Sequence, residues 1–132
     1  MSTVGFIGLG LMGKPMALNL RKKGFDLVVH NRSRGAVDAL VEAGATAADS
    51  PAEVARQASI IVTILPDGPD VASVLEGPNG LFSTMRPGTV IIESSTIAPA
   101  IARRLAAATA ERGGSMLDAP AAAARLGRSP VR

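Results

Sequence analysis

The sequence has no cysteine, tryptophan or tyrosine, and its only histidine is His30. Without cysteine, disulfide bonds, thiolate metal sites and cysteine nucleophiles are excluded. One histidine argues against a metal site built from several histidines and against a Ser-His-Asp triad with a histidine to spare. Three phenylalanines are the only aromatic residues, although 47% of the residues are hydrophobic. The core must therefore consist of Ala, Val, Ile, Leu and Met, which is typical of helices packed on a parallel sheet.

The sequence also lacks a long hydrophobic run. No apolar stretch approaches the roughly 18 residues that a membrane span needs. Met1 to Thr3 precede the first predicted strand without the basic segment of a signal peptide. We therefore expect a cytoplasmic protein with no membrane partner.

The net charge of +3 arises at the end of the chain. All 11 acidic residues lie at or before Asp118, whereas Arg125, Arg128 and Arg132 follow it, so that residues 1–120 have balanced charge. Three arginines without aromatic neighbours offer only weak contact to phosphates. We expect no nucleic-acid partner. Arg21-Lys22-Lys23 is interpreted as the solvated end of a helix.

Apolar segments of strand length alternate with helical patterns. Strands are predicted near residues 3–7, 26–30, 45–47, 60–65, 90–93 and 115–117. This alternation predicts an α/β fold, a Rossmann-like, doubly wound and mostly parallel six-stranded sheet. At 132 residues the chain has the length of about one domain.

The predicted helices carry start and stop signals. Met12, Met16 and Leu20 share one face of the first helix, which is expected to end at Gly24. The remaining signals are Ser33 as N-cap of a helix to Glu42 closed by Gly44, a capping box at Ser50-Pro51-Ala52-Glu53, a helix ending near Glu76, and a helix over residues 99–112.

The first strand leads directly into a glycine-rich turn, Gly8-Leu9-Gly10-Leu11-Met12-Gly13. Gly8 suits the tight turn, Gly10 lets a pyrophosphate approach the backbone, and Gly13 lets the helix pack close to the strand. The helix N-terminus would add free N–H groups for the phosphates. A purely structural turn is the alternative. The flanking strand and helix favour a dinucleotide cradle.

The end of the second strand distinguishes NAD from NADP. It reads His30-Asn31-Arg32-Ser33, without the carboxylate that would accept hydrogen bonds from the adenosine ribose. A basic side chain there suits a 2′-phosphate, so we expect NADP(H) to be preferred over NAD(H). The alternative is that Arg32 only solvates a loop while Asn31 holds a plain ribose.

Two further segments follow strands at the same edge of the predicted sheet. Leu65-Pro66 is either an apolar wall beside the nucleotide or a simple turn. Ser94-Ser95-Thr96 offers hydroxyls that either cap the next helix or bind a nicotinamide or a substrate carboxylate. The pattern alone favours the cap.

Five segments together resemble the β-hydroxyacid dehydrogenase family, which includes 3-hydroxyisobutyrate dehydrogenase, tartronate semialdehyde reductase and glyoxylate/succinic semialdehyde reductase. More distantly, it includes 6-phosphogluconate dehydrogenase. The resemblance covers about residues 3–120. The segments are residues 8–17, Asn31-Arg32-Ser33, Ile64-Leu65-Pro66, residues 93–99 and Leu117-Asp118-Ala119-Pro120.

The resemblance implies hydride transfer between NAD(P)H and a short β-hydroxy or semialdehyde acid. It implies that Ser95 holds the substrate carboxylate. Glu93 replaces the family's usual aspartate, which we expect to change the local geometry only modestly. The cofactor-binding residues that it implies, together with those argued above, are Gly8, Leu9, Gly10, Leu11, Met12, Gly13, Asn31, Arg32, Ser33, Leu65, Pro66 and Thr96.

The sequence departs from the family after Pro120. Family members continue with Val-Ser-Gly-Gly, whereas this chain has four alanines, Ala121 to Ala124. The family's catalytic lysine and all-helical second domain are expected to lie in sequence beyond Arg132. We therefore expect an NADP-binding domain over residues 1–120, an aberrant Ala- and Arg-rich tail over 121–132 from truncation or a frameshift, and no catalytic residue.

Three hypotheses arise for the function. The chain is a catalytically incomplete NADP-binding domain, a non-catalytic nucleotide-binding module that regulates or assembles with a partner, or a fragment without function. A small hydroxy acid or semialdehyde is an expected partner only together with the second domain. The sequence leaves its identity open.

Overall fold

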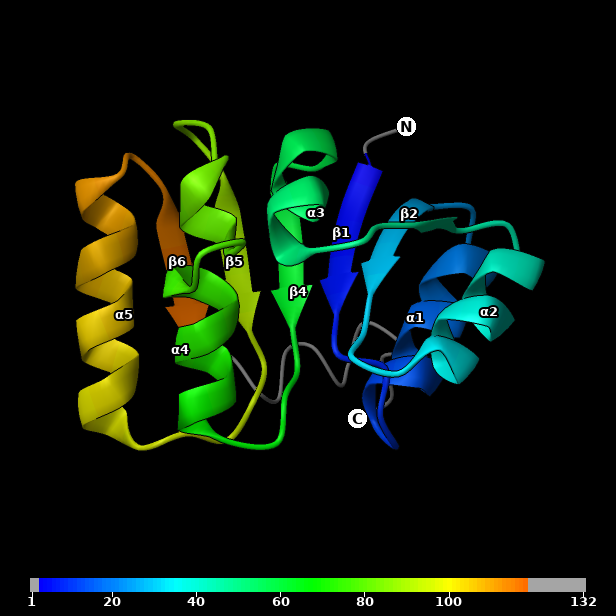
Figure 1. Ribbon diagram of the computed structural model, residues 1–132, viewed down its shortest axis with the longest axis horizontal. Helices are drawn as coiled ribbons and strands as arrows, with labels where there is room; N and C mark the ends of the chain where they lie inside the picture. Colours follow the sequence, from blue (N-terminus) through cyan, green and yellow to red (C-terminus); the bar gives the residue numbers. More distant parts are fainter. Residues whose placement is uncertain (1–2, 119–132) are drawn as a thin grey trace, which may run out of the picture.

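The computed structural model describes residues 3–118, which form a parallel sheet with helices on both faces (Figure 1). The strands are β1 (Thr3–Ile7), β2 (Asp26–His30), β3 (Thr46–Ala47), β4 (Ile60–Thr63), β5 (Val90–Glu93) and β6 (Ser115–Asp118). The helices are α1 (Gly13–Lys22), α2 (Arg34–Glu42), α3 (Pro51–Gln57), α4 (Gly68–Glu76), the 3-10 helix η1 (Leu81–Ser83) and α5 (Pro99–Glu111).

The strand order is β3-β2-β1-β4-β5-β6, and every neighbouring pair is parallel. The chain therefore builds the sheet outward from β1 in one direction and then, from β4, in the other. This is the doubly wound, Rossmann-like arrangement that the sequence predicts. The reversal falls between β1 and β4, where ligands bind in such sheets.

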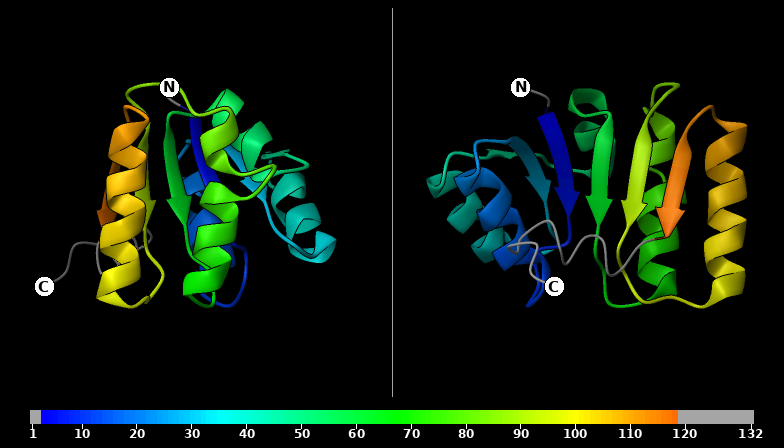
Figure 2. Two further views of the ribbon diagram at one scale, coloured as in Figure 1. Left: turned by 60° about the vertical axis from the view of Figure 1, so that its left-hand side comes forward. Right: turned by 180° about the vertical axis from the view of Figure 1, so that it is seen from behind.

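Each face of the sheet has its own apolar core, as successive side chains of a strand point to opposite faces. Phe6 packs with α1 and α2, whereas Ile7 packs with α3, α4 and α5. Figure 2 shows the helices on the two sides of the sheet. Aliphatic side chains dominate both cores, as the composition predicts.

Several predicted boundaries are wrong by one or two residues. β4 ends at Thr63, so Leu65 lies in the loop beyond the strand. β3 begins at Thr46, and β6 extends to Asp118. α5 ends at Glu111. A strand ends where its neighbour no longer offers a partner. β4 and β6 both end opposite Glu93, the last residue of β5, and hydropathy does not show where such pairing ends.

The predicted apolar row of α1 is correct only in part. Met16 and Leu20 are buried, but Met12 precedes the helix and is 60% exposed. The glycine turn occupies this position, so Met12 does not reach the core. The predicted helix end at Arg21-Lys22-Lys23 is correct, and Lys22 and Lys23 are exposed, but Arg21 is only half-exposed. Its guanidinium donates hydrogen bonds to the backbone carbonyls of Ala43 and Phe25.

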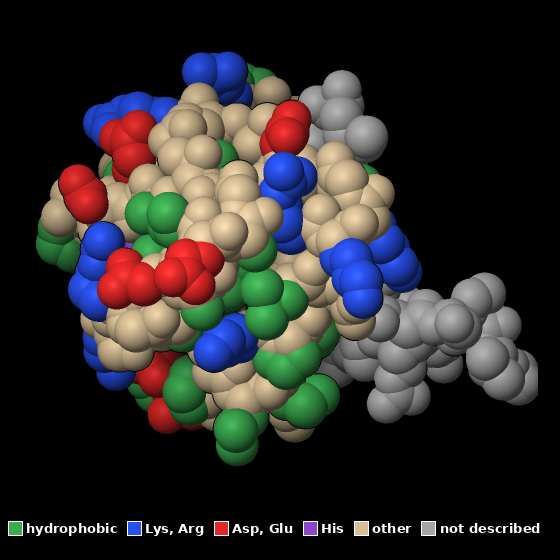
Figure 3. Space-filling model, turned by 90° about the vertical axis from the view of Figure 1, so that its right-hand side faces the viewer, with side chains coloured by type: hydrophobic (Ala, Val, Ile, Leu, Met, Phe, Trp, Pro, Cys, Tyr) green, Lys and Arg blue, Asp and Glu red, His purple; other side chains and the backbone are tan. Residues whose placement is uncertain are grey.

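Exposed side chains of opposite charge are interspersed on the face that Figure 3 shows. Arg34 and Asp38 of α2 form an exposed pair at 3.5 Å. No helix within residues 3–118 is long and apolar enough to cross a membrane. The predicted tail over 121–132, and Ala119 and Pro120 before it, lie outside the described residues.

The two serines predicted to cap helices behave differently. The Ser50 hydroxyl accepts a hydrogen bond from the Glu53 N–H at 3.2 Å, which is one half of the predicted capping box, and the Glu53 carboxylate accepts from Arg56 and Gln57. Ser33 occupies the N-cap position of α2 without a capping hydrogen bond from its side chain. The Ser33 backbone has the extended conformation usual for an N-cap. Its hydroxyl, however, accepts a hydrogen bond from the Asn31 side-chain amide at 3.4 Å rather than from an N–H of α2.

This difference predicts unequal effects of two serine substitutions. Ser50→Ala should lower the free energy of unfolding by about 1 kcal/mol, because it removes the side-chain acceptor of the Glu53 N–H and leaves only the bond to the Ser50 carbonyl at 3.1 Å. Ser33→Ala, the matched control, should change it by less than about 0.5 kcal/mol. Urea unfolding followed by circular dichroism measures both. Equal losses would contradict this assignment of the caps.

Candidate cofactor-binding site

The turn after β1 brings backbone against backbone. Gly8 has φ of +103°, and a Cβ atom there would collide with the Ile64 carbonyl. A Cβ on Gly13 would collide with the Gly8 carbonyl. Both glycines are therefore required by the fold itself. They hold the first turn of α1 at the carboxyl end of β1.

Gly10 has a different environment. It is exposed, and a Cβ atom built on it meets no atom within 4 Å. Packing inside the domain therefore does not require glycine here. A ligand that approaches the backbone closely would require glycine here. Such an open backbone is the cradle expected for a pyrophosphate.

The N-terminus of α1 is available for an anion. Its N-cap residue is Met12, which offers no side-chain cap, and the first turn contains no acidic residue. In contrast, Ser50 and Asp67 cap α3 and α4 through their side chains. N–H groups at the start of a helix that lack a side-chain acceptor favour a phosphate, and the helix dipole adds to this preference.

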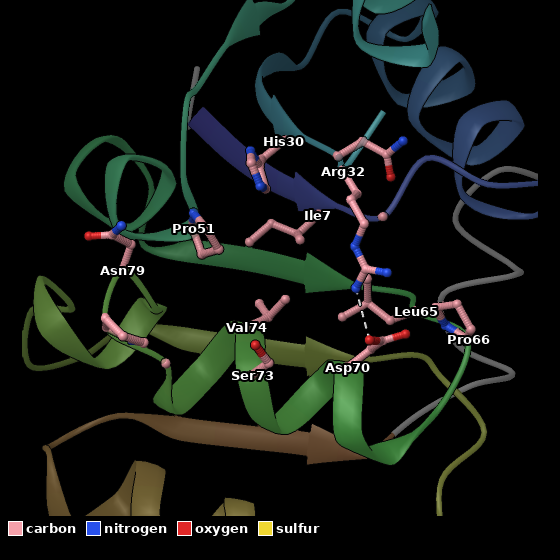
Figure 4. A pocket seen from close by; sticks show the side chains of 14 residues that line it. Ile7, His30, Arg32, Pro51, Leu65, Pro66, Asp70, Ser73, Val74 and Asn79 are labelled. Atoms are coloured by element: carbon pink, nitrogen blue, oxygen red, sulfur yellow. Dashed lines mark hydrogen bonds and ion pairs between the residues drawn. The ribbon is translucent and has the colours of Figure 1, made fainter. Parts of the chain in front are cut away.

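A cavity of about 420 Å³ opens beside this turn, between the ends of β1 and β2 on one side and α4 on the other (Figure 4). We name it the adenosine-side cavity. Its lining is Ile7, Gly8, His30, Asn31, Arg32, Pro51, Leu65, Pro66, Asp70, Ser73, Val74, Gly77, Pro78 and Asn79. Apolar walls with a few polar groups at the rim suit a heterocyclic base and its ribose.

Asn31 links the glycine turn to the end of β2. Its side-chain oxygen accepts a hydrogen bond from the Leu9 N–H at 2.9 Å, and its amide donates to the Ser33 carbonyl at 3.2 Å. The Leu9 side chain is buried in the core, so Leu9 contributes to the site through its backbone. Asn31 thus sets the position of the turn as well as lining the cavity.

Arg32 reaches across the adenosine-side cavity. Its guanidinium forms an ion pair with Asp70 of α4 at 2.9 Å, and its side chain is 84% exposed (Figure 4). The positive group therefore stands at the cavity rim, and a carboxylate from another element accompanies it. No sequence motif indicates this partner, which lies 38 residues away.

A second cavity, of about 280 Å³, lies on the other side of Leu65 and Pro66, and we name it the β5-side cavity. Both cavities include Leu65 and Pro66 in their walls. Its lining is Met12, Met16, Ile64, Leu65, Pro66, Ser94, Ser95 and Thr96. Two cavities that flank a glycine turn match the two halves of a dinucleotide on either side of its pyrophosphate.

The hydroxyls after β5 do not cap α5, and the expectation favoured by the sequence pattern is wrong. The N-cap of α5 is Ala98, without a side-chain capping bond. Ser95 Oγ instead accepts from the Leu65 N–H at 2.7 Å. Ser94 Oγ is buried and has no hydrogen-bond partner among the described residues. An unpaired buried hydroxyl is uncommon in proteins, and Ser94 is one of the residues that line the β5-side cavity.

A buried carboxylate organises this segment. Glu93 is fully buried, and it accepts hydrogen bonds from the Thr63 hydroxyl at 2.7 Å and from the Ser95 N–H at 2.6 Å. Burial raises the pKa of Glu93, and nearby Asp118 acts in the same direction. Hydrogen bonds from Ser95 and Thr63 oppose the rise but are smaller effects.

The structure brings most of the predicted site residues to these two cavities. Gly8, Asn31 and Arg32 line the adenosine-side cavity, and Met12, Ser95 and Thr96 line the β5-side cavity, with Leu65 and Pro66 in both. Gly10 and Leu11 are exposed in the turn, Gly13 is buried beneath it, and Ser33 is the N-cap residue of α2.

Sequence reasoning missed the wall formed by α3, α4 and the loop after α4. Pro51, Asp70, Ser73, Val74 and Asn79 come from these elements. None belongs to a recognisable motif for a binding site. Asp67 caps the start of α4 through its side chain, but a capped helix start does not show what that helix covers.

A protein-family model described as the NAD binding domain of 6-phosphogluconate dehydrogenase matches residues 3–127. The chain belongs to this family. The match includes the glycine turn, both cavities and the whole described sheet, so the site is that of an NAD(P)-binding domain.

Two relatives are similar to this NAD(P)-binding domain over nearly its whole length. A Dictyostelium discoideum protein named "Probable 3-hydroxyisobutyrate dehydrogenase, mitochondrial" is 51% identical over 118 residues, 89% of this chain and 37% of that protein. An NAD-dependent L-serine dehydrogenase from Pseudomonas aeruginosa is 44% identical over 127 residues, 96% of this chain and 43% of that protein. The chain therefore spans about two fifths of these relatives' length.

Solved structures show the same arrangement. Psf3 in complex with NADP+ and 2-OPP has a TM-score of 0.81 at 34% identity, covering 86% of this chain and 40% of that one. Mycobacterium tuberculosis 3-hydroxyisobutyrate dehydrogenase with L-serine has a TM-score of 0.80 at 30% identity, covering 88% and 39%. The names include both NAD and NADP+, so similarity leaves the cofactor preference of this domain unresolved.

The contrast between the glycines predicts separable effects of two substitutions. Gly10→Ala should leave the unfolding midpoint unchanged but weaken cofactor binding by about tenfold or more, equivalent to about 1.4 kcal/mol, because its methyl group enters the ligand's space. Gly8→Ala should destabilise the domain by at least about 1–3 kcal/mol through backbone conformation alone. Thermal unfolding and cofactor titration measure the two effects. Loss of stability in Gly10→Ala would contradict this distinction.

Glu93 predicts a pH dependence of stability. As pH rises from about 4.5 through the raised pKa of the folded state, the unfolded chain loses the Glu93 proton first, so the free energy of unfolding falls. Glu93→Gln, which cannot ionise and can donate to Thr63 while accepting from Ser95, should lack this decrease. Urea titrations of both proteins between about pH 4.5 and 8 give the difference in stability. A difference that stays constant, or shifts in favour of the unsubstituted protein as pH rises, would contradict the prediction.

Proposed function

We propose that this chain is the NADP(H)-binding domain of a 3-hydroxyisobutyrate dehydrogenase-like oxidoreductase, with NADP(H) preferred over NAD(H). One observation carries the preference. The Arg32 guanidinium is 84% exposed at the rim of the adenosine-side cavity, and the end of β2 provides no carboxylate for a ribose. A guanidinium makes strong, charge-assisted hydrogen bonds to phosphate oxygens.

The residues around the glycine turn fit such a cofactor. The open space above Gly10 and the uncapped start of α1 suit its pyrophosphate. The adenosine-side cavity suits the adenine and ribose. On the other side of Leu65, the unpaired Ser94 hydroxyl and the exposed Thr96 suit the polar edge of a nicotinamide. When bound, the cofactor donates or accepts a hydride, and the described residues hold and orient it.

We propose a short β-hydroxy acid, or the corresponding semialdehyde acid, as the substrate of the whole enzyme. The names of the two relatives refer to 3-hydroxyisobutyrate and L-serine, both of which carry a hydroxyl on the carbon β to a carboxylate. In this proposal Ser95 helps to position the carboxylate beside the β5-side cavity. Its hydroxyl is held by the Leu65 N–H, which fixes its place in the wall.

Cofactor titration tests the preference. NADPH should bind the purified chain more tightly than NADH, and Arg32→Gln should weaken NADPH binding by about 10- to 100-fold, the value of a hydrogen bond to a charged group, with little change for NADH. Arg34→Gln is the matched control, because Arg34 is an exposed arginine of α2 outside the cavity lining. Tighter binding of NADH to the unsubstituted chain would refute the preference.

A further inference from the structure

The ion pair between Arg32 and Asp70 joins the two walls of the adenosine-side cavity. Arg32 follows β2, and Asp70 lies in the first turn of α4, so the pair spans from one wall to the other (Figure 4). In this arrangement the guanidinium is already engaged by a carboxylate. Any phosphate that binds Arg32 must share or replace that partner.

The two partners differ in how firmly the fold holds them. Asp70 is 23% exposed, and its N–H donates to the Asp67 carboxylate at 3.0 Å within the capped start of α4. Arg32 is 84% exposed, and its long side chain has far more rotamer freedom. The arginine is therefore the partner that turns, while the carboxylate keeps its place.

We propose that Asp70 is a specificity-determining residue that competes with the cofactor's 2′-phosphate for the Arg32 guanidinium. This inference rests on the proposed binding of NADP(H) beside Arg32. A 2′-hydroxyl needs no positive partner, so NAD(H) leaves the ion pair intact. NADP(H) must draw the guanidinium away from Asp70, and the domain's preference for NADP(H) is smaller than Arg32 alone would give.

The size of this competition depends on exposure. Ion pairs between exposed side chains are weak, because water and salt screen both charges. A phosphate dianion therefore displaces Asp70 readily, but with a measurable loss of affinity. Asp70 narrows the selectivity between the two cofactors without reversing it.

The test compares Asp70→Asn with the unsubstituted chain by titrating each with NADPH and with NADH. Asp70→Asn should tighten NADPH binding by about three- to tenfold at low salt, while the NADH dissociation constant changes by less than about twofold. Glu76→Gln is the matched control. It removes the same charge and an exposed ion pair, to Arg104 at 2.7 Å, from the opposite end of α4. It should leave both dissociation constants unchanged.

A double substitution separates competition from a general effect of charge. In an Arg32→Gln background, Asp70→Asn should no longer tighten NADPH binding, because there is no guanidinium to release. An unchanged NADPH constant in Asp70→Asn, weaker NADPH binding, equal tightening of both cofactors, or an effect that persists without Arg32 would each overturn the inference while the proposed function stands. If the unsubstituted chain binds neither cofactor, the proposed function fails and the inference fails with it. Circular dichroism of each variant verifies that the sheet and helices are retained.

Discussion

The contact of backbone with backbone beneath the glycine turn is the constraint on which the rest of the site depends. Gly8 lies against the Ile64 carbonyl, and Gly13 lies against the Gly8 carbonyl. β1, the loop after β4 and the start of α1 therefore approach one another so closely that a Cβ atom at either glycine would collide with backbone. The first turn of the helix is thereby held where the strand order reverses, between the two cavities. Gly10 differs from these two glycines, because packing inside the domain does not require glycine at that position.

Much of the fold could be predicted because its signals are local. Apolar strands alternate with helical segments, and a glycine-rich turn joins the first pair, so the doubly wound sheet follows from short segments of sequence. Met12 shows where local periodicity fails. It continues the apolar row of Met16 and Leu20, yet the chain is still in the turn at that position. Conformation imposed by neighbouring glycines overrides the hydrophobic pattern.

The part of the site that follows β2 could be predicted from sequence motifs, whereas the wall formed by α4 could not. Asn31 and Arg32 follow a strand whose carboxyl end must reach the ligand edge, so their place follows from topology. Asp70 faces Arg32 only because α4 packs over β4 and β5 and brings its first turn to the same rim. That contact depends on how a helix lies on the sheet. No short pattern in the sequence encodes a contact between residues so far apart.

The wall between the two cavities is fixed by a closed set of hydrogen bonds. Thr63 and Glu93 are paired residues at the ends of adjacent strands. The Thr63 hydroxyl donates to Glu93, Glu93 accepts from the Ser95 N–H, and Ser95 Oγ accepts from the Leu65 N–H. Leu65 cannot move away from β5 without leaving buried polar groups unpaired, which is costly in a dry environment. A cofactor that spans both cavities would thus cross the wall at Leu65, which these hydrogen bonds hold in place. The loop after β5 would move only together with the loop after β4, because Ser95 and Leu65 are bonded to each other.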